Sequence, residues 1–571
     1  MNMHQKTGDT VAQTYMQALA EYGVKHVFAN GGTDFAPIIE GILQSQNTGA
    51  KLPDFVTVPH ENVAVAMAQG YYKVSGEMAG VMVHVNVGTA NTVCAVMNAA
   101  RDNVPILLAA GRTPVTESGH AGSRNVGIHW AQENFDQGAI LREHVKWDYE
   151  LREGQPVDAI VGRALDIAMS EPRGPVYLTL PREVLGNPAL ANGATKRARP
   201  LGNVPAVPSV EALEKAADVI AAAEYPLIVV SGAARNHHAF HALGKLASEH
   251  AIAVSAGAQH SMATSNPMNL GPGVVPLLKN ADVVVVIDSP VPWIPRFGEP
   301  NPNAKLIHIG HDPMFARYPY RGFEMDHAIA GDPGAALDML NEMLKTKLAS
   351  KKDAVEARRK KILEQRAVFD DRRRAAIEQG ASSSPMSYAW VAHCVNQVKG
   401  AKDIVSDELG IGLTYLDMDE PGTFLSTSSG ALGMGLGQAL GAKVAAPDRQ
   451  VISTVGDGSY MFGVPSAAHF VGKAENLPTL TIIMNNSQWW AVRRATVGMY
   501  PDGLASKANS LPIVDLTPSP DYEKITEAFG GYGERVEDPE KMLPALERAY
   551  KKLQDGQQVT INAVVRTRDV H

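Results

Sequence analysis

The chain has 571 residues, of which 45% are hydrophobic, so it is long enough for several cores and for roughly three or four domains. Its formal net charge of -8 is small for this length and gives no attraction for nucleic acid. With 2 cysteines there is no disulfide framework, and no apolar run is long enough to cross a bilayer. The N-terminal residues lack the apolar core of a signal peptide, so we expect a cytoplasmic protein without membrane or nucleic-acid partners.

The first segment, residues 8–185, alternates helical and strand patterns and is predicted to form an N-terminal domain. Its strand candidates are the apolar runs at 27–29, 79–84, 104–110 and 176–180. The first run leads into a tight turn at 30–32, and the second leads into a predicted loop at 88–91. Strands that alternate with helices predict a parallel sheet with right-handed crossovers.

A linker is predicted at 186–204, where Asn, Gly, Ala and Pro occur without apolar periodicity. The next α/β segment, the predicted central domain, spans 205–345 and has strand candidates at 227–230, 281–287 and 305–309. No G-x-G-x-x-G pattern follows any of these strands, which favours a structural domain without its own ligand. A Rossmann-like cofactor domain is the alternative.

Charged residues of both signs fill 349–379 and favour a solvated helix or linker over a nucleic-acid patch. The Ser-Ser-Ser-Pro stretch at 382–385 then marks a boundary. The third segment, residues 386–571, is predicted to form an α/β unit similar to the first. The chain is therefore predicted to be an α/β protein of three consecutive parallel-sheet domains.

Two apolar runs in the third segment end in polar side chains that suit a metal and a phosphate. The run 451–455 leads into Gly456-Asp457-Gly458-Ser459, and the run 480–484 ends at Asn485-Asn486. The glycines let the backbone approach phosphate oxygens, while Asp457 supplies the hard carboxylate oxygen that Mg²⁺ prefers. Because parallel sheets place ligands at the carboxyl ends of their strands, the pattern predicts a metal and diphosphate site.

The whole pattern resembles the thiamine diphosphate motif of the acetolactate synthase, pyruvate oxidase and benzoylformate decarboxylase superfamily, and its details are closest to benzoylformate decarboxylase. The resemblance extends to the first segment, where Val-Pro-His-Glu-Asn at 58–62 precedes a small-residue helical run at 63–70. It implies that Glu61 is catalytic: it bonds the pyrimidine ring of the cofactor and drives its activation. From the residue alone, a favourable first-turn charge of a helix is the alternative.

Two further positions in the first segment are implied to be catalytic. Thr33 follows Asn30-Gly31-Gly32, where relatives have a substrate-facing serine loop, so Thr33 is expected to supply a hydroxyl. His84 opens the stretch 84–91, which resembles the segment that carries an active-site histidine. A histidine can shuttle protons because its pKa is near neutrality, although a satisfied polar residue at a strand end is the alternative for His84.

The resemblance also implies which residues hold the cofactor from the third segment. In the stretch 430–435, the carbonyl of Gly430 would accept from the cofactor's amino group, and Leu432 would be the apolar wedge that bends it. Simple close packing of small residues is the alternative for this stretch. Residues 489–492, which include two tryptophans, would line the substrate pocket. They suggest an apolar or aromatic acyl group, although tryptophan is equally often part of the core.

The remaining implied contacts concern the metal and the diphosphate. The metal ligands would be Asp457, Asn486 and the main-chain oxygen of Gln488. Gly458 and Ser459 would donate backbone N–H groups to the diphosphate. Leu409 lies at 407–410, where relatives have a second diphosphate loop, although the residues there do not match closely.

This sequence departs from the pattern of benzoylformate decarboxylases at one catalytic position. Their second histidine has no counterpart, since the stretch 289–296 offers Trp293 and Arg296 instead. Nucleophilic capture of a second carbonyl, which forms a carbon–carbon bond, therefore becomes more plausible as an outcome beside simple release of an aldehyde. His120, Arg124 and His129 lie on a candidate loop and would suit a carboxylate, but surface positions explain them equally well.

Taken together, these features predict a thiamine diphosphate- and Mg²⁺-dependent lyase or decarboxylase that acts on a 2-oxo acid or an acyloin, with an aldehyde as partner substrate in carboligation. An acetolactate synthase-like transferase, an FAD-linked oxidase and a catalytically silent cofactor-binding protein are the alternatives; FAD is not favoured. The resemblance implies cofactor sites between two subunits, hence a homodimer as the minimum and a homotetramer as the expected assembly.

Overall fold

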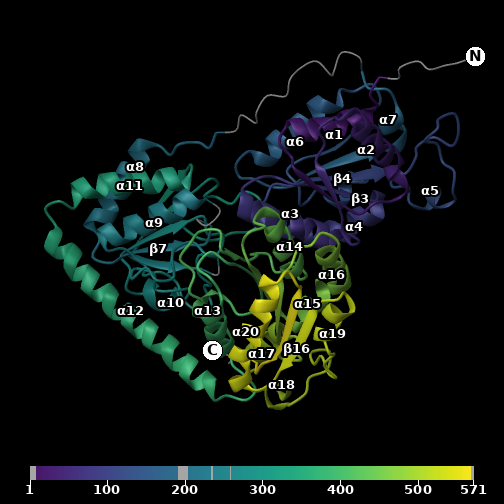
Figure 1. Ribbon diagram of the computed structural model, residues 1–571. Helices are drawn as coiled ribbons and strands as arrows, with labels where there is room; N and C mark the ends of the chain where they lie inside the picture. The colour runs from purple at the N-terminus through teal and green to yellow at the C-terminus, as the bar shows by residue number, and fades with distance from the viewer. Residues whose placement is uncertain (1–7, 191–203, 233–235, 258, 568–571) are drawn as a thin grey trace, which may run out of the picture. The chain divides into compact units, whose positions relative to one another are not determined.

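The computed structural model describes residues 8–190, 204–232, 236–257 and 259–567 (Figure 1). These form two compact units: the first comprises the N-terminal part up to 204 with 427–448 and 459–479, and the second comprises the rest. Most of the linker predicted at 186–204 lies outside the described residues. Within the described residues, no helix is long and apolar enough to span a membrane.

The first unit contains a parallel sheet with strand order β2-β1-β3-β4-β6-β5. Its strands are β1 (His26–Ala29), β2 (Asp54–Thr57), β3 (Gly80–Val83), β4 (Leu107–Arg112), β5 (Asp148–Glu150) and β6 (Val176–Pro181). Helices α1 (Val11–Glu21), α2 (Ala36–Thr48), α6 (Val157–Met169) and α7 (Arg182–Gly186) lie on one face, and α3 (Glu61–Ser75) and α4 (Val85–Arg101) lie on the other (Figure 1). Both faces are thus covered, as buried apolar strands require.

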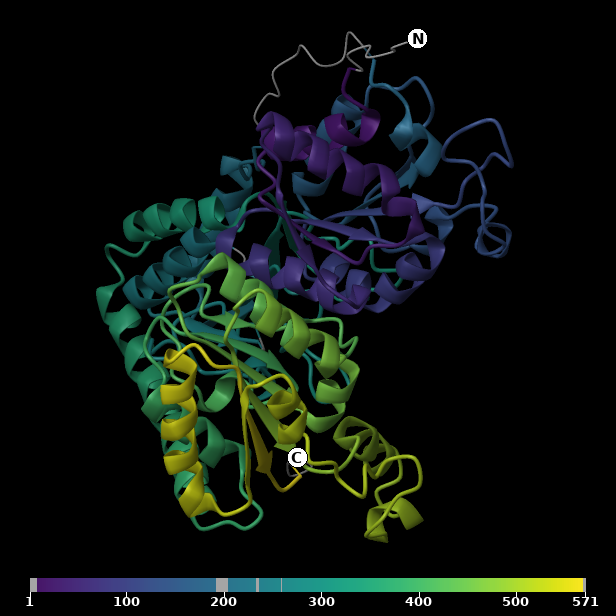
Figure 2. The same cartoon turned by 45° about the vertical axis from the view of Figure 1, so that its right-hand side comes forward.

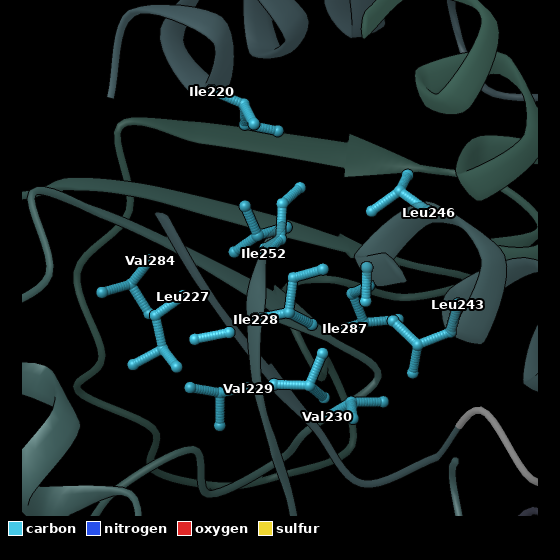
Figure 3. Packing of buried hydrophobic residues seen from close by; sticks show 14 of the residues in the cluster. Ile220, Leu227, Ile228, Val229, Val230, Leu243, Leu246, Ile252, Val284 and Ile287 are labelled. Carbon is cyan, nitrogen blue, oxygen red and sulfur yellow. The ribbon is translucent and has the colours of Figure 1, made fainter. Parts of the chain in front are cut away.

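The second unit contains the central sheet, with strand order β11-β10-β9-β7-β8. Its strands are β7 (Pro226–Val230), β8 (Ala253–Ala256), β9 (Val283–Ile287), β10 (Lys305–Gly310) and β11 (His327–Ala330), and its main helices are α8 (Val210–Ala222), α9 (His237–His250) and α11 (Pro333–Lys347). Figure 3 shows Leu227 to Val230 of β7 packed with Leu243 and Leu246 of α9. Side chains on both faces of β7 are buried, which explains its uninterrupted apolar sequence.

A third parallel sheet, also in the second unit, has the order β13-β12-β14-β15-β17-β16. Its strands are β12 (Ile404–Glu408), β13 (Phe424–Leu425), β14 (Val451–Gly456), β15 (Leu480–Asn485), β16 (Tyr532–Val536) and β17 (Val559–Val564), with helices α13 (Tyr388–Val398) and α20 (Pro539–Gln554). The charged stretch is the long helix α12 (Lys352–Ala381). Counted along the chain, this strand order repeats that of the first sheet, which confirms the predicted similarity and the three parallel-sheet α/β domains.

In the first and third sheets, the first and third strands of each segment are neighbours, as β1 is beside β3 and β12 is beside β14. The order reverses at this point, because the second strand lies on the outer side of the first. Chain segments that leave two such neighbouring strands diverge and create a crevice at the carboxyl ends. Each sheet is therefore built to present polar groups just after β1 and β3, and just after β12 and β14.

Helix α14 (Gly435–Ala445) belongs to the first unit and runs alongside α3 (Figure 2). The two backbones approach closely because glycines meet the opposite helix. A Cβ atom at Gly70 would lie 2.0 Å from the main-chain oxygen of Gln438, and one at Gly441 would lie 1.9 Å from that of Met67. Since α3 begins at Glu61, this packing fixes the position of the predicted catalytic glutamate.

The loop predicted at 88–91 is wrong, because these residues lie in α4. His84 is the N-cap of that helix, and the N–H of Gly88 donates to the His84 carbonyl at 2.7 Å. The Thr89 hydroxyl donates to the carbonyl of Val85 at 2.7 Å, so it satisfies its polarity inside the helix. Tertiary packing thus outweighs the weak helix propensity of Gly and Thr.

Candidate active site

Glu61 is the first residue of α3 and is buried, with 6% of its surface exposed. Its carboxylate accepts hydrogen bonds from Asn30 Nδ2 at 2.9 Å and from Asn91 Nδ2 at 3.0 Å. Asn30 follows β1 and Asn91 lies in α4, so two uncharged side-chain amides from different parts of the domain bond the carboxylate. Within the described chain no ion pair involves Glu61. The bonded amides orient the carboxylate and leave lone pairs for another N–H donor, which suits a protonated pyrimidine ring nitrogen.

Gly88 brings the backbone of α4 close to the Glu61 carboxylate. A Cβ atom at Gly88 would lie 3.3 Å from Glu61 Oε1 and 3.0 Å from the side chain of Val83. A larger residue at this position would therefore press against the carboxylate. The small residue and the buried, neutral-bonded carboxylate together fit the cofactor that the sequence predicts.

His84 is paired with a carboxylate that the sequence analysis missed. Asp34 is 3% exposed, and its Oδ1 lies 2.5 Å from His84 Nδ1. This hydrogen bond is the main reason why the pKa of His84 is raised, although partial burial acts in the opposite direction. With Nδ1 held by Asp34, Nε2 is the nitrogen through which His84 can transfer a proton.

The Asp34–His84 pair fits only because two neighbouring positions are glycine. A Cβ atom at Gly32 would lie 2.1 Å from His84 Nδ1, and one at Gly111 would lie 1.8 Å from Asp34 Oδ2. The sequence offered one signal for Asp34: it is an acidic residue next to Thr33, in a glycine-containing turn after a strand. This turn lies where the strand order of the sheet reverses. Thr33 itself is exposed, and its carbonyl accepts from Arg182 Nη1 at 3.3 Å, so its catalytic role remains a prediction.

The stretch around Gly430 and Leu432 is a bent segment that precedes α14. Gly430 is exposed with φ +74°, and Gly433 has φ +96°, backbone angles that favour glycine. Asn62 Nδ2 donates to the carbonyl of Gly433 at 2.9 Å, and Asn98 Nδ2 donates to that of Ala431 at 2.7 Å. Leu432 is half-buried. The shape of the segment is thus imposed by specific bonds rather than by packing of small residues alone.

In the second unit, the structure brings Asp457 together with the loop that follows β15. Asp457 is 2% exposed; its Oδ1 accepts from the N–H of Gly458 at 2.9 Å, and its Oδ2 accepts from that of Ser487 at 2.6 Å. Burial raises the pKa of Asp457 to about 6. In the described part of the chain no basic side chain forms an ion pair with it, so a cation would stabilise the charged form.

The neighbouring loop supplies the other predicted oxygens. Asn486 Nδ2 donates to the Tyr388 hydroxyl at 3.1 Å, and its Oδ1 accepts from the N–H of Gln488 at 3.0 Å, which fixes the amide orientation. One carboxylate, one amide oxygen and one main-chain oxygen form a hard donor set that fits Mg²⁺. Among the described residues, no group of three or more His, Cys, Asp and Glu side chains is suited to a metal.

The diphosphate loop leaves no space for a side chain at Gly458. A Cβ atom there would lie 2.1 Å from Cζ3 of Trp489, so the ring can pack against this backbone only because the residue is glycine. Ser459 is buried, whereas Leu409, after β12, is 58% exposed with φ +54°. Of the predicted pocket residues 489–492, Trp489 packs on the loop, and the last two are exposed in α17 (Trp490–Met499).

Trp293 and Arg296, which stand where benzoylformate decarboxylases have a second histidine, do not form an acid–base site. Trp293 is buried and packs edge-on against Phe323, with ring centroids 5.2 Å apart. Arg296 is exposed and donates to the carbonyl of Gly498 at 3.3 Å. On the other candidate loop, His120 is exposed, which agrees with the surface alternative, but His129 is buried.

Comparison with known proteins agrees with this geometry. The chain matches the thiamine pyrophosphate enzyme N-terminal TPP binding domain over 9–140, the central domain over 213–340 and the C-terminal TPP binding domain over 410–562. It is 27% identical to a benzoylformate decarboxylase of Pseudomonas aeruginosa, over 95% of this chain and 96% of the relative.

More distant relatives differ in reaction. An acetolactate synthase isozyme 3 large subunit of Escherichia coli is 22% identical (97% of this chain, 94% of the relative), and a 2-hydroxyacyl-CoA lyase of Oryza sativa subsp. japonica is 24% identical (94% and 92%). The structure of a thiamine diphosphate-dependent 4-hydroxybenzoylformate decarboxylase of Rhodococcus jostii RHA1 shares the fold, with TM-score 0.77, 21% identity and coverage of 98% of this chain and 100% of that chain. The chain therefore belongs to the thiamine pyrophosphate enzymes, as a thiamine diphosphate-dependent member of their decarboxylase and lyase group.

Proposed function

We propose that the protein cleaves the carbon–carbon bond next to the carbonyl of a 2-oxo acid, releasing carbon dioxide and an aldehyde, with Mg²⁺ as the metal. The observation that carries this proposal is the pair of the buried Asp34 and the half-buried His84, which places a protonatable imidazole near Glu61. When bound, thiamine diphosphate supplies an electron sink for the electron pair of the broken bond. The protein then has to orient the substrate and deliver a proton.

We propose the following residues for the binding of this cofactor. Glu61 would accept a hydrogen bond from the protonated nitrogen of its pyrimidine ring, and the segment with Gly430 and Leu432 would support its bent conformation. Asp457, Asn486 and the carbonyl of Gln488 would hold Mg²⁺. The remaining contacts are those of the diphosphate, which would rest on Gly458, Ser459 and Leu409.

His84 is the proton donor in this proposal. Asp34 favours the charged imidazolium, so the group enters the reaction as an acid near neutral pH. Its Nε2–H can protonate the carbon from which carbon dioxide has departed, after which the aldehyde leaves. Thr33, one residue before Asp34, would contribute a hydroxyl to the orientation of the substrate.

Carboligation is the second candidate activity, because Trp293 and Arg296 provide no second acid at the position where benzoylformate decarboxylases have one. If proton delivery is slow, an acceptor aldehyde can capture the same carbon and give a hydroxyketone. An FAD-linked oxidase is the third, and a yellow purified protein would favour it. We also propose a homodimer as the minimal active assembly and a homotetramer in solution, which analytical ultracentrifugation tests.

The deciding experiment incubates the protein, reconstituted with thiamine diphosphate and Mg²⁺, with a panel of 2-oxo acids and acyloins. Products are identified by mass spectrometry, with and without an added acceptor aldehyde. Aldehyde and carbon dioxide without acceptor support the proposal, whereas a hydroxyketone that requires both partners supports carboligation. Bound cofactor without any product would instead indicate a catalytically silent binding protein.

A further inference from the structure

The segment 113–137, between β4 and the one-turn 3₁₀ helix at 138–140, is a long loop that buried contacts hold in place. Arg182 Nη2 donates to the carbonyls of Gly122 at 2.7 Å and Ser123 at 2.8 Å. Glu183 Oε1 accepts from the N–H of Thr116 at 3.0 Å. Arg182 also donates to the carbonyl of Thr33, so the loop is tied to the turn that carries Asp34.

A second set of contacts fixes the far end of the loop. Glu133 accepts from both Arg112 and Arg124, at 2.9 Å and 2.5 Å. Arg112 ends β4, so Glu133 joins the loop to the carboxyl end of the sheet. The short helix α5 (Ile128–Ala131) lies between these attachment points. Its residues therefore have defined positions relative to the Asp34–His84 pair.

His129 lies in α5 and is 2% exposed. Its Nδ1 accepts a hydrogen bond from the N–H of Asn125 at 3.3 Å, so in the neutral ring the proton is on Nε2. This Nε2 is buried and has no hydrogen-bond partner among the described residues. A buried N–H without an acceptor is unfavourable, so a water molecule or a ligand group is expected to accept a hydrogen bond from Nε2.

The surroundings of His129 favour an anion as that ligand. Burial lowers the pKa of His129, and the positive charges of Arg182, Arg124 and His84 lower it further, while Glu183 acts in the opposite direction. Both effects favour the neutral ring, whose Nε2–H is a donor beside these positive charges. Gln132, the C-cap of α5, is three residues further along and contributes to the raised pKa of His84, so the same turn lies near the proton donor.

We propose that His129 Nε2–H donates to the carboxylate of the 2-oxo acid substrate, so that the active site selects acids over the corresponding aldehydes and neutral acyloins. This inference rests on the proposed function and names its substrate class. A neutral donor recognises the carboxylate without the strong ground-state stabilisation of a direct ion pair, which would oppose loss of carbon dioxide. His129 and His84 thus divide between them recognition and proton delivery.

The test measures binding of stable carboxylates to the holoprotein by calorimetry, with lactate and mandelate as probes and ethanol and benzyl alcohol as their uncharged counterparts. His129→Leu should weaken binding of the carboxylates about 10- to 100-fold, because a hydrogen bond to a charged group contributes about 1.5–3 kcal/mol. His129→Gln, which keeps an N–H donor at the end of the side chain, should stay within about 3-fold of wild type. His120→Leu, on the exposed histidine of the same loop, is the matched control and should change nothing.

Circular dichroism and the thermal midpoint of His129→Leu show whether this variant is folded. If it is not, the test is the carboxylate affinity of His129→Gln compared with that of wild type and of His129→Asn. Unchanged carboxylate affinity in His129→Leu, or a wild type that binds the alcohols as well as the acids, would overturn the inference. The proposed function fails separately, if wild type releases no carbon dioxide from any 2-oxo acid even though it binds the probes through His129.

Discussion

Replacement of Gly441 by alanine tests whether close packing of two helices sets the position of the catalytic glutamate. Gly441 lies in α14 where this helix meets α3, and a Cβ atom there would lie 1.9 Å from the main-chain oxygen of Met67. The obstructing atom is backbone, so no side-chain rotation can relieve the contact. The two helices must instead move apart.

The displacement and its cost follow from this geometry. Because real Cβ contacts are not shorter than 3.0 Å, the helices must separate by about 1 Å. Overpacking costs about 1–3 kcal/mol, and a rigid backbone contact belongs at the upper end. Alanine regains about 1 kcal/mol of helix propensity, which leaves a net loss of about 2 kcal/mol. For a unit of this size we expect a thermal midpoint lowered by about 4–8 °C.

The functional consequence is larger than the loss of stability. Glu61 is the first residue of α3, and a misplacement of about 1 Å at a catalytic group can reduce rates about 100-fold. We therefore expect kcat/KM to fall about 10- to 100-fold in Gly441→Ala, measured with the best 2-oxo acid of the panel. Gly498→Ala is the matched control, because this helical glycine has no atom within 4 Å of its Cβ position. Wild-type stability and activity in Gly441→Ala would refute the reasoning.

Four further predictions test individual side chains. Glu61→Gln should lower kcat at least about 1000-fold while calorimetric cofactor affinity stays within about 10-fold; normal turnover would contradict its catalytic role. Asp34→Asn removes the carboxylate that raises the pKa of His84, so the decline of kcat/KM on the alkaline side should move to lower pH, and an unshifted profile would exclude His84 as the acid. Asp457→Asn should lose the Mg²⁺-dependent retention of cofactor on gel filtration, and undiminished retention would remove Asp457 from the metal site. Burial lowers the pKa of His260 to about 4, below the ordinary 6.5, so the full contribution of its neutral ring to stability is present above pH 6.5, and about 2–3 kcal/mol is lost by pH 4.5. In His260→Gln the urea midpoint of unfolding should therefore depend less on pH. The same pH dependence as in wild type would show that His260 is not the cause.

The buried strands were the most predictable part of the fold. The runs 227–230 and 451–455 are continuous and apolar because helices cover both faces of the sheets, and the structure confirms them as β7 and β14. Edge strands escaped detection: β2 has two exposed residues among its four, and β13 has only two residues. Such strands are defined by their partner in the sheet and leave little periodicity in the sequence.

The site was predictable where its residues are close in sequence and was missed where a contact joins distant ones. Asp457 and Asn486 belong to one strand–loop–strand pattern, and their loops indeed meet through the bond from the N–H of Ser487 to Asp457. The pair Asp34 and His84 is separated by 50 positions, and nothing in either local pattern indicates that they touch. The loop that carries His129 is likewise held by a residue distant in sequence, Arg182, so the sequence left the role of His129 open.

The repeated strand order explains how one topology produces two chemistries. His84 follows β3 as Asp457 follows β14, so both occupy the same point of their sheets, beside the reversal of strand order. The two residues differ in the groups to which they are hydrogen-bonded. Asp34 favours the charged form of His84, whereas Asp457 is bonded to backbone N–H groups and its burial disfavours charge until a cation is near. If His84 and Asp457 were exchanged and their hydrogen-bond partners were left in place, neither a proton donor nor a metal ligand should result. The sheet determines where each side chain lies, whereas its hydrogen-bond partners determine whether it is charged.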